Sequence, residues 1–410
     1  MHICMVTSSY PRYPGDIAGT FILALAQAIT ELGHQVSVVA PADPTATHSE
    51  TGPIPVTRFR YSPVPGIQPM GYGKALENDQ RLRFSAYACA PPYLISGVWQ
   101  LLKTAQRFSA DVIHAHWVLP NGPVGLLAST IARKPLVTTL HGSDVYLAKR
   151  SPVLGWLAGK SLAGSRAVTA CSPDLAQDAQ VLGASEERTH LIPWGADPRR
   201  FGSGDGLRWR KRLGIEPWQP VVLGVGRLVE KKGFLHLVEA FHQISKDHPE
   251  AMLVLGGEGP ARRELETWAR QLGVAANVRF SGRVPWEEMP DLLAMADVVV
   301  APSIRDASGN QDGLPTVVLE AMAAGKPVVA SNVAGLPLVV EHEGTGLLVP
   351  PQDVPALAGA LHALLSEPER ARSYGCAGRR RVETELNWRA IGARYVEVYS
   401  QAMGNQACAS

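Results

Sequence analysis

The sequence predicts an α/β protein of two domains, each built on a parallel sheet with helices on both faces. Short apolar runs alternate with longer segments of helical periodicity along the chain, and this alternation is typical of doubly wound sheets. The pattern breaks near the middle and then restarts. A chain of 410 residues also exceeds one typical core of about 100 to 200 residues, which favours two domains.

The first half contains five candidate strands with helical segments between them. A helix over 20–32 is predicted because its apolar residues recur three or four positions apart, and Gly33 ends it. The candidate strands are residues 2–6, 36–40, 112–115, 136–140 and 167–170.

A domain boundary is expected within residues 195–214, which are rich in Gly, Asp and Arg and show little apolar periodicity. We therefore expect domains of residues 1–196 and 197–387. The tail from residue 388 is predicted to be helical, and it either crosses back onto the first domain or caps the second. The second half has candidate strands at 221–225, 252–255, 278–280, 298–301 and 328–330.

Composition and charge exclude several classes of protein. Hydrophobic residues make up 46% and charged residues 19% of the chain, which is typical of a globular protein. A net charge of +2 gives no global positive field for nucleic acid. The five cysteines are scattered and form no CxxC pair, which argues against a disulfide framework or a zinc site and favours a cytoplasmic location.

The longest uncharged stretch is residues 84–102, and it contains Pro91 and Pro92. These prolines and several polar residues argue against a membrane span. A buried or cleft-lining helix is the favoured interpretation, and the alternative is an element at the inner membrane surface that meets a lipid-linked acceptor. The first strand is followed by a Pro/Gly loop instead of a cleavage site, so no export signal is expected.

The strongest local motif is the basic turn at residues 226–233, which follows a predicted buried strand and opens a helix. Ligands of doubly wound sheets bind at this edge. Arg227 offers a fork for two phosphate oxygens and Lys232 a mobile charge, while the start of the helix adds its amides and dipole. The motif suits a diphosphate, and the alternative is a solvated basic turn.

A second motif begins with Asp312-Gly313-Leu314-Pro315 and includes Glu320. Pro315 fits an early helical position, and the amides of Gly313 and Leu314 would then face an anion or a sugar hydroxyl. The alternatives are that Asp312 is only an N-cap and Glu320 a solvated helix residue.

A third motif, residues 141–144, follows a predicted strand of the first domain. His141 can donate to a sugar hydroxyl or a phosphate oxygen, and Asp144 can cap the next helix or orient that histidine. His114 and His116 flank the end of a strand and are more simply interpreted as core or edge histidines than as ligands. Weaker glycine-rich signals at the same kind of edge are residues 15–19, 256–260 and 281–284.

Together these motifs resemble glycosyltransferase family 4, a group of retaining enzymes with the GT-B fold, in which two Rossmann-like domains face a central cleft. The resemblance runs in order from the first strand to Trp388. The matching segments are the glycine loop before Thr20 and Phe21, His116-Trp117 with residues 120–122, and residues 141–144, 193–197, 226–233, 256–260 and 312–325.

The resemblance implies a role for each candidate residue. Arg227 and Lys232 would hold the donor pyrophosphate, and Glu320 the ribose hydroxyls. Asp312 stands where the family usually has Glu and would contact the donor sugar. The remaining implied donor-binding residues are Gly19, Gly226, Gly257, Val284 at the base, Gly313, Leu314 and Pro315, with His141 on the reacting face of the sugar.

The predicted function is retaining transfer of a hexose from a UDP- or GDP-sugar to a saccharide or lipid-linked acceptor in polysaccharide or glycoconjugate biosynthesis. The sequence has no Asp-x-Asp motif, so we expect no metal or other cofactor, with cationic side chains and amides in the metal's place. The alternatives are a sugar-nucleotide epimerase of the same fold and a non-catalytic two-domain sugar-binding protein.

Overall fold

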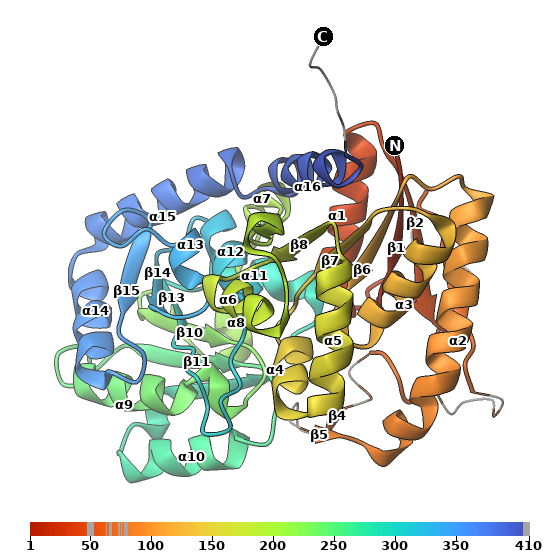
Figure 1. Cartoon of the computed structure of the whole chain (residues 1–410). Coiled ribbons are helices and arrows are strands. Elements are labelled where there is room, and N and C mark those ends of the chain that lie inside the picture. The colour runs from red at the N-terminus through yellow and green to blue at the C-terminus, as the bar shows by residue number, and fades with distance from the viewer. Residues whose placement is uncertain are drawn as a thin grey trace. The chain divides into compact units, whose positions relative to one another are not determined.

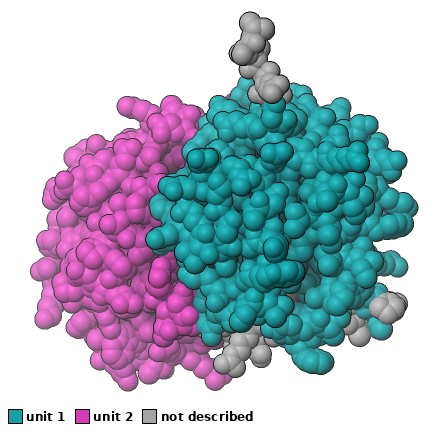
Figure 2. All heavy atoms as spheres, viewed as in Figure 1, with its two compact units in different colours: residues 1–192, 388–410 teal, residues 193–387 magenta. Residues whose placement is uncertain are grey.

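The computed structural model describes residues 1–46, 53–62, 64, 68–72, 74, 76, 77 and 81–404. The chain forms two compact units (Figure 2). Unit 1 comprises Met1–Ile192 and Trp388–Ser410, and unit 2 comprises Pro193–Asn387. The last helix therefore belongs to the same unit as the first strand.

Unit 1 is built on a seven-stranded parallel sheet with the strand order β3-β2-β1-β6-β7-β8-β9. A separate antiparallel pair joins β4 (Leu76–Glu77) to β5 (Arg81–Leu82). The strands of the main sheet are β1 (His2–Val6), β2 (Gln35–Pro41), β3 (Val56–Phe59), β6 (Val112–His116), β7 (Leu136–Thr139), β8 (Ala167–Ala170) and β9 (Thr189–Leu191).

All helices of unit 1 except α16 lie between strands of this sheet along the chain, and α2, α3 and α5 pack side by side (Figure 1). On α16, an added Cβ at Gly392 would lie only 3.0 Å from the Cβ of Ala28, so the last helix packs closely on α1. The helices are α1 (Thr20–Glu31), α2 (Phe84–Arg107), α3 (Val118–Ala132), α4 (Ser143–Arg150), α5 (Pro152–Gly164), α6 (Pro173–Leu182) and α16 (Trp388–Ala402).

Unit 2 repeats the architecture with a six-stranded parallel sheet in the order β12-β11-β10-β13-β14-β15. Its strands are β10 (Val221–Val225), β11 (Met252–Gly256), β12 (Val278–Gly282), β13 (Val298–Ala301), β14 (Val328–Ser331) and β15 (Gly346–Val349). Its helices are α7 (Pro198–Phe201), α8 (Gly206–Leu213), α9 (Phe234–Ile244), α10 (Arg262–Gln271), α11 (Met289–Ala294), α12 (Thr316–Ala323), α13 (Leu336–Val339), α14 (Val354–Ser366) and α15 (Pro368–Thr384).

The predicted fold class is confirmed, because both sheets are parallel and doubly wound, and each predicted strand occurs within two residues of its expected bounds. The segment around 195–214, which lacks apolar periodicity, nevertheless forms α7 and α8. Asp197 and Asp205 cap these helices by accepting backbone N–H groups, and Trp209 is the buried residue of α8. These short helices are therefore stabilised by their N-caps and by one buried aromatic side chain, and not by an apolar face along the helix.

Helix α2 is half-buried and continues through Pro91 and Pro92. Tyr93 and Leu101 face the interior, whereas the side chains of Ile95 and Trp99 are exposed. One side of α2 is therefore buried, and the exposed side leaves open whether it lines a cleft or meets a membrane surface. In the described residues, no helix combines the length and the apolar character needed to cross a membrane.

Candidate functional site

Three loops of unit 2 are tied together at the carboxyl ends of β10, β11 and β12. The amide of Gly226 donates to the carbonyl of Gly256 (2.9 Å), and the amide of Gly257 donates to the carbonyl of Gly282 (2.9 Å). At Gly257, where φ is 134°, an added Cβ would lie 1.9 Å from the Gly226 carbonyl oxygen. Only glycine allows this approach. Val284 follows in the third loop and is half-buried.

The basic turn after β10 directs two lysines at one carboxylate. Lys232 Nζ lies 2.6 Å from Asp312 Oδ2, and Lys231 Nζ lies 3.1 Å from Asp312 Oδ1. Burial opposes ionisation of Asp312, but the two ammonium groups hold its pKa well below the usual value. Partial burial lowers the pKa of Arg227, and the Asp312 charge offsets part of that effect. Three cationic side chains therefore interact electrostatically with the single carboxylate of Asp312.

The start of α12 presents backbone donors beside this carboxylate. Within the described part of the chain, the amides of Gly313 and Leu314 have no protein acceptor, although the Gly313 carbonyl accepts from the Gly335 amide (2.8 Å). Pro315 occupies the N-cap position, one residue before the helix, so its expected helical position is wrong. Because Pro315 is the N-cap, Asp312 is not, and that alternative role is excluded.

Glu320 lies on the buried face of α12, and only 6% of the residue is exposed. It is therefore not the solvated helix residue of the alternative interpretation. Burial raises the pKa of Glu320 to about 7, against the lowering effects of a hydrogen bond with Thr316 and of the charges on Arg200 and Lys232. Near neutral pH this carboxyl group can be held in either protonation state.

In unit 1, His141 follows β7 and is held between aromatic rings. Its imidazole stacks on Trp117 with 4.0 Å between ring centroids, and Phe21 of α1 lies 5.4 Å away. Burial lowers the pKa of His141 well below the usual value, and His116 adds to this effect. The ring is therefore neutral at physiological pH and can donate one hydrogen bond and accept another.

Asp144 fixes the backbone on which His141 stands. Its Oδ1 accepts from the amides of His141 (3.2 Å) and Gly142 (2.9 Å), and its Oδ2 accepts from the amide of Val118 (2.7 Å). Burial raises the pKa of Asp144 to about 6, against these hydrogen bonds. Asp144 thus orders the loop backbone, and the N-cap of α4 is Gly142.

His114 and His116 are both fully buried on β6. His114 bonds to Tyr399 of α16 through Nδ1 (2.8 Å) and to Thr139 through Nε2 (2.7 Å). Neither ring nitrogen of His116 has a hydrogen-bond partner within the described residues. The core interpretation therefore accounts for the hydrogen bonds of His114, whereas His116 stands beside His141 with its polar atoms unused.

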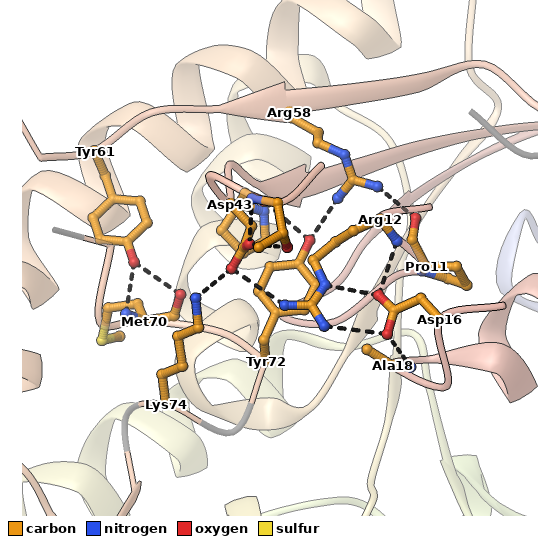
Figure 3. A network of polar contacts seen from close by, with 12 residues as sticks. Pro11, Arg12, Asp16, Ala18, Asp43, Arg58, Tyr61, Met70, Tyr72 and Lys74 are labelled. Carbon is orange, nitrogen blue, oxygen red and sulfur yellow. Dashed lines mark hydrogen bonds and ion pairs between the residues drawn. The ribbon is translucent and has the colours of Figure 1, made fainter. Parts of the chain in front are cut away.

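The loop between β1 and α1 is organised by a charged network (Figure 3). Arg12 Nε lies 2.7 Å from Asp16 Oδ2, and Asp16 also accepts from the amide of Ala18 (3.2 Å). Asp43, after β2, pairs with Lys74 and with Arg12 (3.4 Å to Nη1). Gly19 closes the loop with φ 72°, and an added Cβ would lie 2.4 Å from the Ser9 carbonyl oxygen.

The structure therefore gathers the predicted residues into two groups, one in each unit. In unit 1, His141 contacts Phe21, which follows Gly19 by two positions. The unit 2 group consists of Gly226, Arg227, Lys232, Asp312, Gly313, Leu314, Pro315 and Glu320. Lys231 was missed by sequence reasoning, although its position beside Lys232 was a usable signal. Within the described residues, no three His, Cys, Asp or Glu side chains cluster in a way that could hold a metal ion.

Comparisons with known proteins agree with this arrangement. The family profile "Glycosyl transferases group 1" matches residues 206–381, and the profile "Glycosyl transferase 4-like domain" matches residues 18–195. The GDP-mannose-dependent alpha-(1-6)-phosphatidylinositol monomannoside mannosyltransferase of Mycolicibacterium smegmatis is 39% identical over 54% of this chain, and the match spans 58% of that enzyme.

Two further similarities cover more of the molecule. The alpha-maltose-1-phosphate synthase of Mycolicibacterium smegmatis is 32% identical over 71% of this chain and 79% of its own length. The structure of sucrose-phosphate synthase from Thermosynechococcus elongatus superposes with a TM-score of 0.76 at 25% identity, covering 98% of this chain and 99% of that one. The chain therefore belongs to the group 1 glycosyltransferases of the family 4 type, which are built on the two Rossmann-like domains of the GT-B fold.

Proposed function

We propose that this glycosyltransferase moves a hexose, with retention at the anomeric carbon, from a UDP- or GDP-sugar to a saccharide or lipid-linked acceptor. The observation that carries the proposal is the unit 2 group, in which Lys231 and Lys232 pair with Asp312, and the Asp312 charge also acts on Arg227. The neighbouring amides of Gly313 and Leu314 add donors without a protein acceptor in the described chain. The three cationic side chains outnumber the Asp312 carboxylate, and together with the two amides they offer hydrogen-bond donors to a diphosphate.

The proposed mechanism relies on charge stabilisation by the protein. When the sugar leaves the nucleotide, negative charge grows on the phosphate oxygen that bridged them. Arg227 and Lys232, fixed before the reaction, would stabilise that charge more in the transition state than in the bound donor. We propose that they and the backbone amides do so without a metal ion.

The remaining donor contacts follow from the family resemblance. Glu320 is proposed to accept hydrogen bonds from the ribose hydroxyls, and Val284 to present backbone to the base. Asp312 is proposed to contact the sugar, and its two lysine partners keep it ionised for that contact. The GDP-mannose dependence of the 39% identical relative supports a nucleotide-sugar donor.

On the unit 1 side, His141 is proposed to bond a hydroxyl of the transferred sugar. The neutral imidazole between Trp117 and Phe21 suits an uncharged sugar because no ion must be desolvated. The family resemblance implies retention with attack on the face that the leaving group vacates, and we assign no residue of the described site as a covalent nucleophile.

The experiment that tests the proposal is a two-stage assay. Thermal shifts with UDP and GDP identify the base, because a bound ligand raises the melting temperature according to its affinity. Sugar conjugates of that nucleotide are then incubated with and without saccharide acceptors. Acceptor-dependent release of the nucleotide is expected. Conversion of the donor sugar without acceptor would indicate the epimerase, and binding without any turnover would indicate the sugar-binding protein.

A further inference from the structure

The helices α2, α3 and α5 of unit 1 form a face with an unusual composition, here called the α2-α3-α5 face. In the described residues, eight of the fourteen exposed large hydrophobic side chains lie on these three helices. Single exposed apolar residues are ordinary, but a concentration of them on one face marks an interaction surface. The eight are Phe84, Tyr87, Ile95, Trp99, Leu127, Ile131, Val153 and Trp156.

On α2 these residues form a stripe. Phe84, Tyr87, Ile95 and Trp99 are spaced so that they share the solvent side of the helix, while Tyr93 and Leu101 face the core. Ile95 is 71% exposed and Trp99 57% exposed. The neighbouring helices α3 and α5 continue the apolar surface, because α3 packs between α2 and α5 (Figure 1).

The charge of this face has one sign. None of the three helices contains an acidic residue. Basic residues stand instead on or just after their carboxyl-terminal ends, and the Lys103 ammonium lies 3.9 Å from the centroid of the Trp99 ring. These basic residues are Lys103, Arg107, Arg133, Lys134, Lys160 and Arg166.

We propose that the α2-α3-α5 face binds the surface of an anionic lipid bilayer. Exposed Trp, Tyr and aliphatic side chains enter the headgroup region, and a basic rim without acidic neighbours complements anionic headgroups. Lys103 fits this role because its stem lies along Trp99 and its charge reaches beyond the ring. Charge complementarity favours a bilayer over a protein partner, since protein surfaces carry both signs.

Membrane binding would be a second property, independent of the proposed sugar transfer. In parallel sheets the connecting helices run opposite to the strands, so the amino ends of α2 and α5 lie at the edge where the strands end. The exposed Phe84, Tyr87, Val153 and Trp156 stand at these amino ends. A bilayer bound there would present a lipid-linked acceptor to the ligand edge of unit 1.

The test is flotation of the full chain with vesicles of phosphatidylcholine, with and without phosphatidylglycerol. The wild type is expected to bind the mixed vesicles. The double variant I95S/W99S should reduce partitioning about tenfold through lost apolar contact. K103E/R107E should reduce it at least about tenfold and only with the anionic vesicles. Matched controls in unit 2 are W218S, at a tryptophan 69% exposed, and K246E/R263E.

Several outcomes would overturn the proposal. These are absence of wild-type binding, equal binding to neutral vesicles, or equal losses in the unit 2 controls. A concentration-dependent dimer abolished by I95S/W99S would instead assign the face to contact between copies. Nucleotide binding by the same variants, measured by calorimetry, should equal that of the wild type. Vesicle binding without any nucleotide binding would refute the proposed transfer and leave the membrane inference standing.

Discussion

The two units share an architecture but treat charge differently at the loop that follows their first strand. In unit 1, Arg12 is held by Asp16 and Asp43, so cations and carboxylates alternate in one network (Figure 3). In unit 2, Lys231 and Lys232 both pair with Asp312, and the Asp312 charge also acts on Arg227. A parallel sheet edge therefore does not itself create an anion site. Under the proposed function, the anion site of unit 2 depends on which side chains meet at that edge.

The two side chains proposed to contact the sugar, His141 in unit 1 and Asp312 in unit 2, also differ in charge. In unit 1, burial among aromatic rings keeps His141 neutral. In unit 2, paired lysines keep Asp312 ionised despite burial. This difference is the reason for proposing that unit 2 binds the charged diphosphate of a donor and that unit 1 meets uncharged hydroxyl groups.

The largest expected effect comes from removing a cation of unit 2. Arg227→Ala and Lys232→Ala should each lower kcat for transfer by about two to three powers of ten, as for loss of one preorganised transition-state donor. Initial rates of nucleotide release measure this effect. Arg263→Ala, an exposed arginine of α10, is the matched control and should keep the wild-type rate. A folded Arg227→Ala protein with full activity would remove Arg227 from the site.

A second effect should follow from the neutral histidine of unit 1. His141→Ala is expected to lower kcat about a hundredfold, because a hydrogen bond to the reacting sugar is lost. Since the pKa of His141 lies well below its usual value, the wild-type rate should show no histidine titration between about pH 6 and pH 8. A rate that falls with a pKa near the usual histidine value, and only while His141 is present, would show that the ring titrates in the working enzyme.

Much of this arrangement follows from the sequence, and the remainder depends on tertiary contacts. Strands such as β1 and β10 are continuous apolar runs, so their positions could be predicted. The pairing of both lysines with Asp312 could not, because the two segments are about eighty positions apart in the chain. Which side of α2 is exposed could not be predicted for a related reason. Apolar content predicts burial, whereas neighbouring helices decide which side is covered.

A smaller effect concerns the stability of unit 2. Burial raises the pKa of Glu320 from 4.5 to about 7. The folded state therefore binds this proton more tightly than the unfolded state, so the contribution to stability is present below about pH 4.5 and is lost as the pH rises through about 7. Glu320→Gln, which cannot ionise, should gain about 2 kcal/mol relative to wild type between about pH 5 and pH 8.

Urea unfolding of the unliganded wild type and of Glu320→Gln at about pH 5 and pH 8 measures this difference in unfolding free energy. Glu383→Gln removes an exposed carboxyl group on α15 and retains Glu320, so the stability of this control should change with pH in parallel with that of the wild type. If the stabilities of Glu320→Gln and wild type change in parallel with pH, Glu320 does not titrate in this range.

The smallest expected effect is that of metal removal. If Arg227 and Lys232 take the place of a metal ion, transfer in excess EDTA should proceed at the untreated rate. The measurement compares initial rates with and without EDTA, followed by addition of magnesium or manganese. Loss of activity in EDTA that either ion restores would show that the cations of unit 2 do not suffice.

The central claim is that the lysines and arginine of unit 2 bind the donor diphosphate. Calorimetric titration of wild type and Lys232→Ala with the preferred nucleoside diphosphate and with the corresponding nucleoside tests it directly. The account predicts that Lys232→Ala weakens diphosphate binding at least about tenfold, the effect of losing a hydrogen bond to a charged group, and leaves nucleoside binding unchanged. Equal affinity of the two proteins for the diphosphate would contradict the account.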